Sequence, residues 1–247
     1  VSGSTTTITT PSLGSFSLGA SNGSVSYLYD EEVPQAYEQV SDAKQTISNQ
    51  VGDYMDNNHI AYTSPTFEVF GASVTGHLGY SPQPLDDTTS TGDGGQATYT
   101  PGIGKGTEAG ITIAYEGLKV GVYGSERDRT VPYTVTGTGN YEHDEFNGVW
   151  YAKYSFGPVA IGYSESYMDA GKSGTTITTN TKKTERTHAG IFTGEQMSIA
   201  FNVNDNMSIS YTTSDETYDT QDDALTATTN DDDVTETIDA VQFAYSM

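Results

Sequence analysis

Apolar and polar side chains alternate along most of this chain. The connections between these stretches also alternate, a short one following a long one. Alternation with period two is typical of β-strands, because successive side chains point to opposite faces. Short turns are expected around Ser12, Thr66, Gly117, Gly157 and Asp205. Between them, long polar connections are expected around Glu38, Asp93, Arg129, Ser173 and Asp223. This asymmetry favours a transmembrane up-and-down β-barrel, since a soluble β-sandwich has no reason to keep it.

About eleven strands are expected, counting a Thr-rich extended stretch at residues 1–9. The others are predicted at Ser15–Ala20, His59–Thr63, Phe70–Tyr80, Ile111–Tyr115, Leu118–Tyr123, Trp150–Phe156, Val159–Tyr163, Glu185–Val203, Met207–Tyr211 and Val241–Tyr245. The stretch Glu185–Val203 is long enough for two strands broken at Gly194, but one strand is favoured because its apolar side chains keep the same parity. In each strand one face holds aliphatic and aromatic residues and the other holds small polar residues. The pattern predicts an apolar outer surface and a wet interior.

Charge and composition narrow the function classes. The chain has 33 acidic and 10 basic side chains and a formal net charge of −23. This excludes a nucleic-acid-binding surface as the default, because phosphates are bound by clustered Lys and Arg, but it allows a cation-attracting channel or divalent-ion binding. Only 34 % of the residues are hydrophobic, which suits a barrel with a polar interior. There is no cysteine, and the first residues show no signal-peptide pattern, so a secreted form needs a leader upstream.

A long acidic connection, residues 21–58, lies early in the chain. A loop of this length inside a compact β protein is usually functional. We expect it to fold inward and narrow the barrel, where carboxylates raise the local concentration of cations. The candidate constriction acids are Asp30, Glu31, Glu32, Glu38 and Asp42. The alternative is an acidic loop that faces solvent.

The strand parity also points to residues of the interior wall. Those that have the parity of the predicted inner face are His59, His77, Lys119 and Lys153. The histidines of the chain are scattered without metal-ligand spacing, which favours lumen or loop positions over a metal site.

Three consecutive acids, Asp231, Asp232 and Asp233, form a candidate Ca²⁺ site, because Ca²⁺ binds several carboxylate oxygens. No complete calcium-loop motif accompanies them, and the alternative is a charged extracellular loop. No other cofactor is expected.

Motifs of enzymes are missing from the sequence. It contains neither a G-x-S-x-G nucleophile elbow nor a G-x-x-x-x-G-K-[ST] phosphate loop. Paired carboxylates are plentiful, but an acid-rich chain produces them by chance. We therefore expect that the protein is not an enzyme.

The strand motif SFSLG, the acidic loop and NNHIAYTSPTF are followed by VWYAKYSFGPVAIGYSESY and SIAFNVNDNMSISY. In this order they resemble the general porins of the Gram-negative outer membrane, and the resemblance covers nearly the whole chain. It implies a trimeric barrel of about sixteen strands. Residues 1–247 would be a single partial domain with roughly the fourth to fourteenth strands, and both ends would be missing. At the eyelet, the loop acids Asp30, Glu31 and Glu32 would face basic wall residues.

The resemblance implies passive diffusion of small hydrophilic solutes and ions through the outer membrane. A homotrimer would be surrounded by lipid and lipopolysaccharide, and the acidic charge favours cations. The alternative is a secreted, acidic, β-rich surface or adhesion protein stabilised by Ca²⁺. That alternative explains the charge and the Thr- and Asp-rich loops, but neither the regular alternation of turns nor the apolar outer faces.

Overall fold

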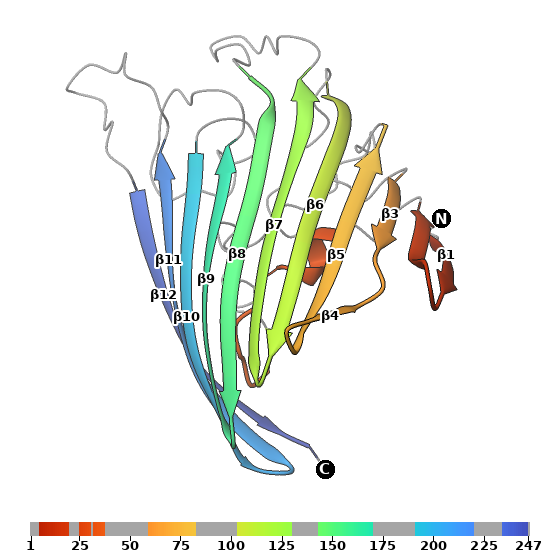
Figure 1. The fold of residues 1–247 in the computed structure, drawn as a ribbon. Helices are drawn as coiled ribbons and strands as arrows, with labels where there is room; N and C mark the ends of the chain where they lie inside the picture. The colour runs from red at the N-terminus through yellow and green to blue at the C-terminus, as the bar shows by residue number, and fades with distance from the viewer. Residues whose placement is uncertain are drawn as a thin grey trace, which may run out of the picture.

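Twelve antiparallel strands form one curved sheet in the computed structural model of the protein (Figure 1). The structure describes residues 5–19, 25–30, 32–37, 59–82, 103–129, 143–169, 191–219 and 234–246. The strands are β1 (Thr5–Thr10), β2 (Gly14–Gly19), β3 (His59–Thr63), β4 (Phe67–Val69), β5 (Ala72–Ser81), β6 (Ile103–Tyr115), β7 (Leu118–Arg129), β8 (Glu145–Phe156), β9 (Val159–Asp169), β10 (Ile191–Asn204), β11 (Met207–Asp219) and β12 (Val234–Tyr245). A 3₁₀ turn, η1 (Val25–Leu28), follows β2.

The sheet has the up-and-down topology that the sequence predicts. Strands that follow one another in the chain are hydrogen-bonded neighbours, in the order β1-β2-β3-β5-β6-β7-β8-β9-β10-β11-β12, with β4 beside β5. Short turns join strands at residues 11–13, 116–117, 157–158 and 205–206, as expected. Within the described ranges, no helix has the length and hydropathy to cross a membrane.

The turn expected around Thr66 was wrong. Residues 64–66 interrupt a strand: β3 and β4 lie on either side of them, and both pair with β5. Pro65 cannot donate a ladder hydrogen bond, and the Ser64 hydroxyl accepts one from the Gly76 amide at 2.9 Å. The chain reverses at Phe70 and Gly71, whose φ values are 51° and 84°. The prediction of a strand at Phe70 was therefore wrong. It arose because Phe70 is spaced by an even number of residues from the apolar side chains of β5.

Several strands are longer than predicted. Strand β7 continues to Arg129, so Arg127 belongs to a strand and not to the expected loop, and β6 begins at Ile103. Strand β10 runs through Gly194 without a break from Ile191 to Asn204. This confirms the single-strand interpretation over that range, and residues 185–190 lie outside the described part.

The two faces of the sheet have the inverse of the usual burial. Ile111, Ile161 and Phe201 are 41 %, 44 % and 41 % exposed. On the opposite face, Ser198 and Thr212 are 3 % and 0 % exposed. A soluble sheet hides its apolar side and shows its polar side to water. Here the apolar side faces outward and the polar side faces inward, as the sequence predicts.

The apolar outer surface, called the belt below, crosses the strands obliquely between β5 and β11, and Phe146 on β8 and Tyr167 on β9 are exposed aromatic side chains beyond its sloping edge. On β5 its last apolar side chain toward the long connections is Tyr80, and the line of paired residues from Tyr80 ends at Asp219 on β11. Asp219 lies eight residues beyond Tyr211, the last apolar outward side chain of β11. That is roughly 27 Å along the strand for roughly 29 Å across six strand spacings, a slope of about 43°.

A first prediction concerns the strained hairpin at Phe70. Both residues of this turn have positive φ, a conformation that Asn and Gly adopt most easily. Phe70 is fully exposed and would lose no burial on replacement. Phe70→Asn should raise the free energy of unfolding by about 1 kcal/mol, measured by denaturant titration in detergent micelles.

Glu116 is the matched test of this interpretation, because it holds the equivalent turn position with φ 44° before Gly117. Glu116→Asn should stabilise the protein in the same direction. A loss of stability in both variants would contradict strain at these turns.

Candidate functional site

Residues 25–30 and 32–37, together called the inner segment below, lie against the polar face of the sheet. Their contacts run across the wall from β5 and β6 to β12, so one short stretch of chain spans most of the sheet. Three groups of contacts attach it.

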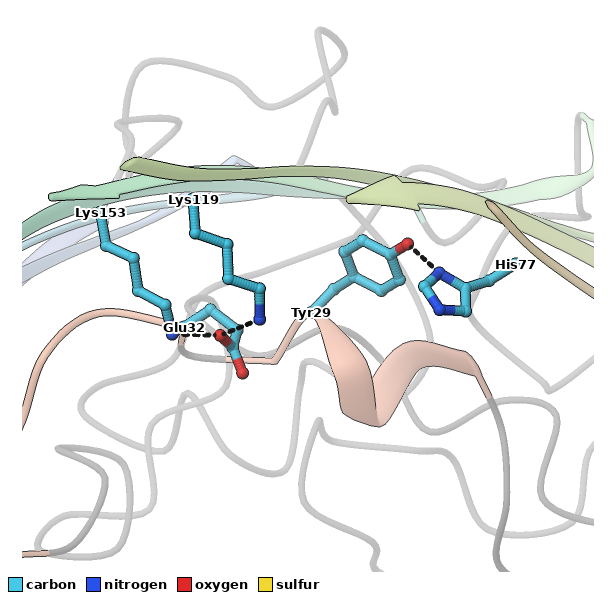
Figure 2. Close-up of polar contacts among 5 residues, drawn as sticks. All are labelled: Tyr29, Glu32, His77, Lys119 and Lys153. Carbon is cyan, nitrogen blue, oxygen red and sulfur yellow. Dashed lines mark hydrogen bonds and ion pairs between the residues drawn. The ribbon is translucent and has the colours of Figure 1, made fainter. Parts of the chain in front are cut away.

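The first attachment is an aromatic and polar cluster around η1. The Val25 amide donates to Glu108 Oε1 at 2.9 Å, and Tyr123 Oη donates to Glu108 Oε2 at 2.8 Å. Tyr29 is 0 % exposed, and its ring centroid lies 5.3 Å from that of Tyr123. Its hydroxyl shares a 2.6 Å hydrogen bond with His77 Nδ1 (Figure 2).

Burial, together with Tyr151 and Glu108, raises the pKa of Tyr29 well above its ordinary value. A tyrosine hydroxyl is protonated at neutral pH even at its ordinary pKa, and the raised pKa of Tyr29 extends this range further into alkaline pH. The bond to His77 is thus made by neutral phenol and holds η1 against β5 and β6.

The second attachment is an ion cluster. Lys119 on β7 and Lys153 on β8 are directly paired across the two strands, and both ammonium groups bind Glu32 Oε2, at 3.2 Å and 2.5 Å (Figure 2). Like charges in this arrangement repel one another, so the Glu32 carboxylate stabilises the pair. Both ammonium groups also lie over the Tyr151 ring, 5.5 Å and 5.7 Å from its centroid, a favourable cation–π geometry.

The third attachment uses the backbone of the segment. Ser198 on β10 donates to the carbonyl of Pro34. The Ala36 amide donates to Ser210 Oγ on β11 at 2.9 Å, and the Tyr37 amide donates to Gln242 Oε1 on β12 at 3.3 Å. Polar side chains of the wall thus satisfy backbone groups that a lone extended segment would leave unpaired.

The inner segment crosses the strands with the same slope as the belt. Tyr29 lies at Gly110 on β6, and the line of paired residues from Gly110 reaches Glu216 on β11. Ala36 binds Ser210, six residues below Glu216. That is roughly 20 Å along the strand for roughly 24 Å across the sheet. The segment therefore stays at one height relative to the belt, on the other side of the wall.

The predicted site residues fall into three groups. Three wall residues contact the inner segment: Lys119, Lys153 and His77. Glu32 belongs to the inner segment and binds both lysines. Asp30 is described, and its amide donates to the Ser26 carbonyl at 3.1 Å. His59 lies on the polar face, 2 % exposed, beside Gly19. Those that lie outside the described residues are Glu31, Glu38, Asp42, Asp231, Asp232 and Asp233.

Within the described ranges, no three His, Cys, Asp or Glu side chains are grouped so that they could hold a metal ion. The candidate Ca²⁺ site at residues 231–233 remains a prediction.

The sequence reading missed four important partners. Two of them, Tyr29 and Pro34, are residues of the inner segment that bind the wall. The other two are wall residues: Glu108 binds the Val25 amide, and Tyr151 lies under the ammonium groups of Lys119 and Lys153. Strand parity places Glu108 and Tyr151 inward, but nothing local says that they meet this segment. A further inward pair, Arg127 and Glu145, is buried and joined by Arg127 Nη2 to both carboxylate oxygens at 2.7 Å. It was missed because Arg127 was assigned to a loop.

Comparisons with known proteins support the fold. No protein-family model matches the chain, and no curated protein matches its sequence. Among solved structures, outer-membrane expressed OmpT of Vibrio cholerae aligns with a TM-score of 0.51 and 15 % identity over 94 % of this chain and 62 % of OmpT. A loop L8 deletion mutant of OmpT, described as an outer membrane protein of the same organism, gives 0.50, 15 %, 94 % and 65 %.

These similarities establish the fold type alone. The described sheet is of the kind found in outer-membrane β-barrel proteins, and the chain spans less than two thirds of each matched structure.

A second prediction concerns the ion cluster. Glu32→Gln leaves Lys119 and Lys153 as an uncompensated like-charge pair and should lower the free energy of unfolding by about 1 kcal/mol, a modest value because the side chains are partly exposed. Adding Lys153→Gln should restore part of the loss, because the repulsion is removed. Denaturant titration of the single and double variants measures this coupling.

Lys105→Gln serves as the control. Lys105 and Asp128 form an exposed pair at 3.7 Å, so its loss should change stability little. Additive effects of Glu32→Gln and Lys153→Gln would mean that the cluster is not coupled.

Proposed function

We propose that this chain forms a water-filled channel in the bacterial outer membrane, through which small hydrophilic solutes and ions diffuse passively. The observation that carries the proposal is the position of the inner segment. It crosses the polar side of the wall at the height at which the outer side is apolar. A segment in that position narrows a channel where the channel crosses the membrane.

The belt supports the membrane location. Its slope of about 43° is within the 35–45° by which strands of membrane barrels tilt. A belt with this slope becomes level when the strands tilt by the same angle, and a level belt matches the flat hydrocarbon layer of a bilayer. The fold shared with outer-membrane OmpT agrees with this location.

Polar atoms on the inner face support a wet interior. Within the described part of the chain, the Ser125 and Ser166 hydroxyls, both amide atoms of Asn147 and the Tyr151 hydroxyl are buried without a protein hydrogen-bond partner. Buried polar groups of this kind are costly unless water binds them. A water-filled channel supplies that water, and no bound intermediate is needed for flux.

Cation preference is part of the proposal and rests on the acidic excess of the whole chain. Glu32 contributes little to it, because two lysines compensate its charge. The acidic excess of the whole chain, a net charge of −23, raises the concentration of cations near a low-dielectric channel.

The complete channel in this proposal is a barrel of about sixteen strands, assembled as a homotrimer in lipid and lipopolysaccharide. The coverage of 62 % of OmpT agrees with a chain that represents part of such a barrel. No enzymatic role is proposed. A secreted Ca²⁺-stabilised surface protein is disfavoured, because an outer face with Val241 at 74 % and Phe243 at 59 % exposure would be unstable in water.

Planar-bilayer recording tests the channel directly. The protein should give discrete conductance steps, and under a salt gradient the reversal potential should have the sign of cation preference. An anion-sign potential would remove the selectivity and leave the channel. Absence of steps, with a protein that stays monodisperse in plain buffer and melts on addition of a chelator, would favour the surface protein.

The belt gives a further prediction. Ile199 lies in the belt on β10, whereas Thr193 lies on the same face of the same strand beyond the belt. Ile199→Arg should reduce the free energy of folding into lipid vesicles by about 2–4 kcal/mol, and Thr193→Arg by about 0–1 kcal/mol. Equal effects of the two substitutions, measured by denaturant titration in vesicles, would argue against a membrane belt.

A further inference from the structure

Three glycines of the inner face lie directly under the inner segment or under a side chain that supports it. A Cβ atom on Gly110 of β6 would lie 2.4 Å from the Tyr29 ring, and one on Gly162 of β9 would lie 2.3 Å from Pro34 Cδ. On Gly121 of β7 it would lie 2.3 Å from the Tyr151 ring. Ordinary van der Waals contact begins at 3.4 Å. Each glycine therefore provides a recess that another group already fills.

The groups in the recesses cannot easily move aside. Pro34 is a rigid ring fixed to its own backbone, and Val33 Cα would lie only 3.3 Å from the same Cβ. Tyr29 is fully buried between Tyr123, Tyr151 and His77. A side chain at Gly162 or Gly110 can thus be accommodated only if the inner segment itself shifts away from the wall.

Gly121 acts one layer below the inner segment. It allows the Tyr151 ring to lie across β7, and this ring supports the ammonium groups of Lys119 and Lys153. Both lysines hold Glu32. A side chain at Gly121 would lift the ring, and the ion cluster with it, toward the interior.

We infer that Gly110, Gly121 and Gly162 are positioning residues that set the distance between the inner segment and the wall, and thereby the free cross-section of the channel. The inference rests on the proposed function. At Gly162, relief of the contact requires the segment to move by about 1 Å. The wall blocks movement outward, so the shift is directed into the interior and narrows it.

Single-channel conductance of the full-length protein tests the inference. Gly162→Ala should conduct less than the original protein, and Gly162→Val less again, because the displaced volume grows. Gly124→Ala on β7 is the control for adding a methyl group to the wall without a clash, since Gly124 lies on the outer face and its Cβ would lie 3.6 Å from the nearest atom, an ordinary contact. Unchanged conductance in Gly162→Ala and Gly162→Val, at unchanged stability, would overturn the inference.

A rescue separates positioning from general damage to the fold. Pro34→Ala removes the Cδ atom that a Cβ at Gly162 would meet. The double variant Gly162→Ala with Pro34→Ala should therefore recover most of the lost conductance. If the second change lowers conductance further, the loss did not come from this contact, and the inference fails.

A chemical measurement keeps the test independent of channel activity. The chain has no cysteine, so Ala36→Cys and Ser210→Cys introduce one defined pair where the segment meets β11. Disulfide formation between them should be slower when Gly162→Ala is added and unaffected by Gly124→Ala. If the original protein forms no channel, the proposed function fails, while the disulfide rates still decide whether the glycines position the segment. Equal rates in all chains would overturn the inference.

Discussion

Backbone hydrogen bonds between neighbouring strands hold this sheet together. Because neighbouring strands satisfy the backbone groups, the side chains of each face are free to match whatever surrounds that face. The chain uses this freedom in the inverse sense to a soluble protein, with Ile111 and Phe201 outside and Ser198 and Thr212 inside. Both the belt and the polar wall follow from the same alternating sequence pattern, because alternate side chains point to opposite faces of the sheet.

The wall and the inner segment are complementary in charge and in shape. Two lysines paired across β7 and β8 would repel one another, and the carboxylate of Glu32 compensates them. Glycines on β6 and β9 leave room for Tyr29 and Pro34. The segment thus has a defined place, and its contacts lie at a constant height because they cross the strands with the slope of the belt.

Sequence reasoning succeeded where the physics is local. The parity of Lys119 and Lys153 and the acidity around Glu32 were readable, and they led to the residues that form the ion cluster. It failed at Phe70, whose position in the alternation masked a turn with positive φ. It also failed at Arg127, where a charged run at the end of β7 looked like a loop although Glu145 pairs with it on the buried face. Neither the turn conformation nor the partner is encoded within a few residues of the position.

The faces of the strands, most of the tight turns and the sign of the charge could be predicted from the chain alone, because they depend on period two, on turn-forming residues and on composition. The contact of Glu32 with lysines 87 and 121 residues away appears only in the folded sheet. The reason is that such meetings depend on strand register and on the oblique path of the segment across the sheet. The register and the path each depend on every strand pairing between Glu32 and the lysines, so no single stretch of sequence contains them.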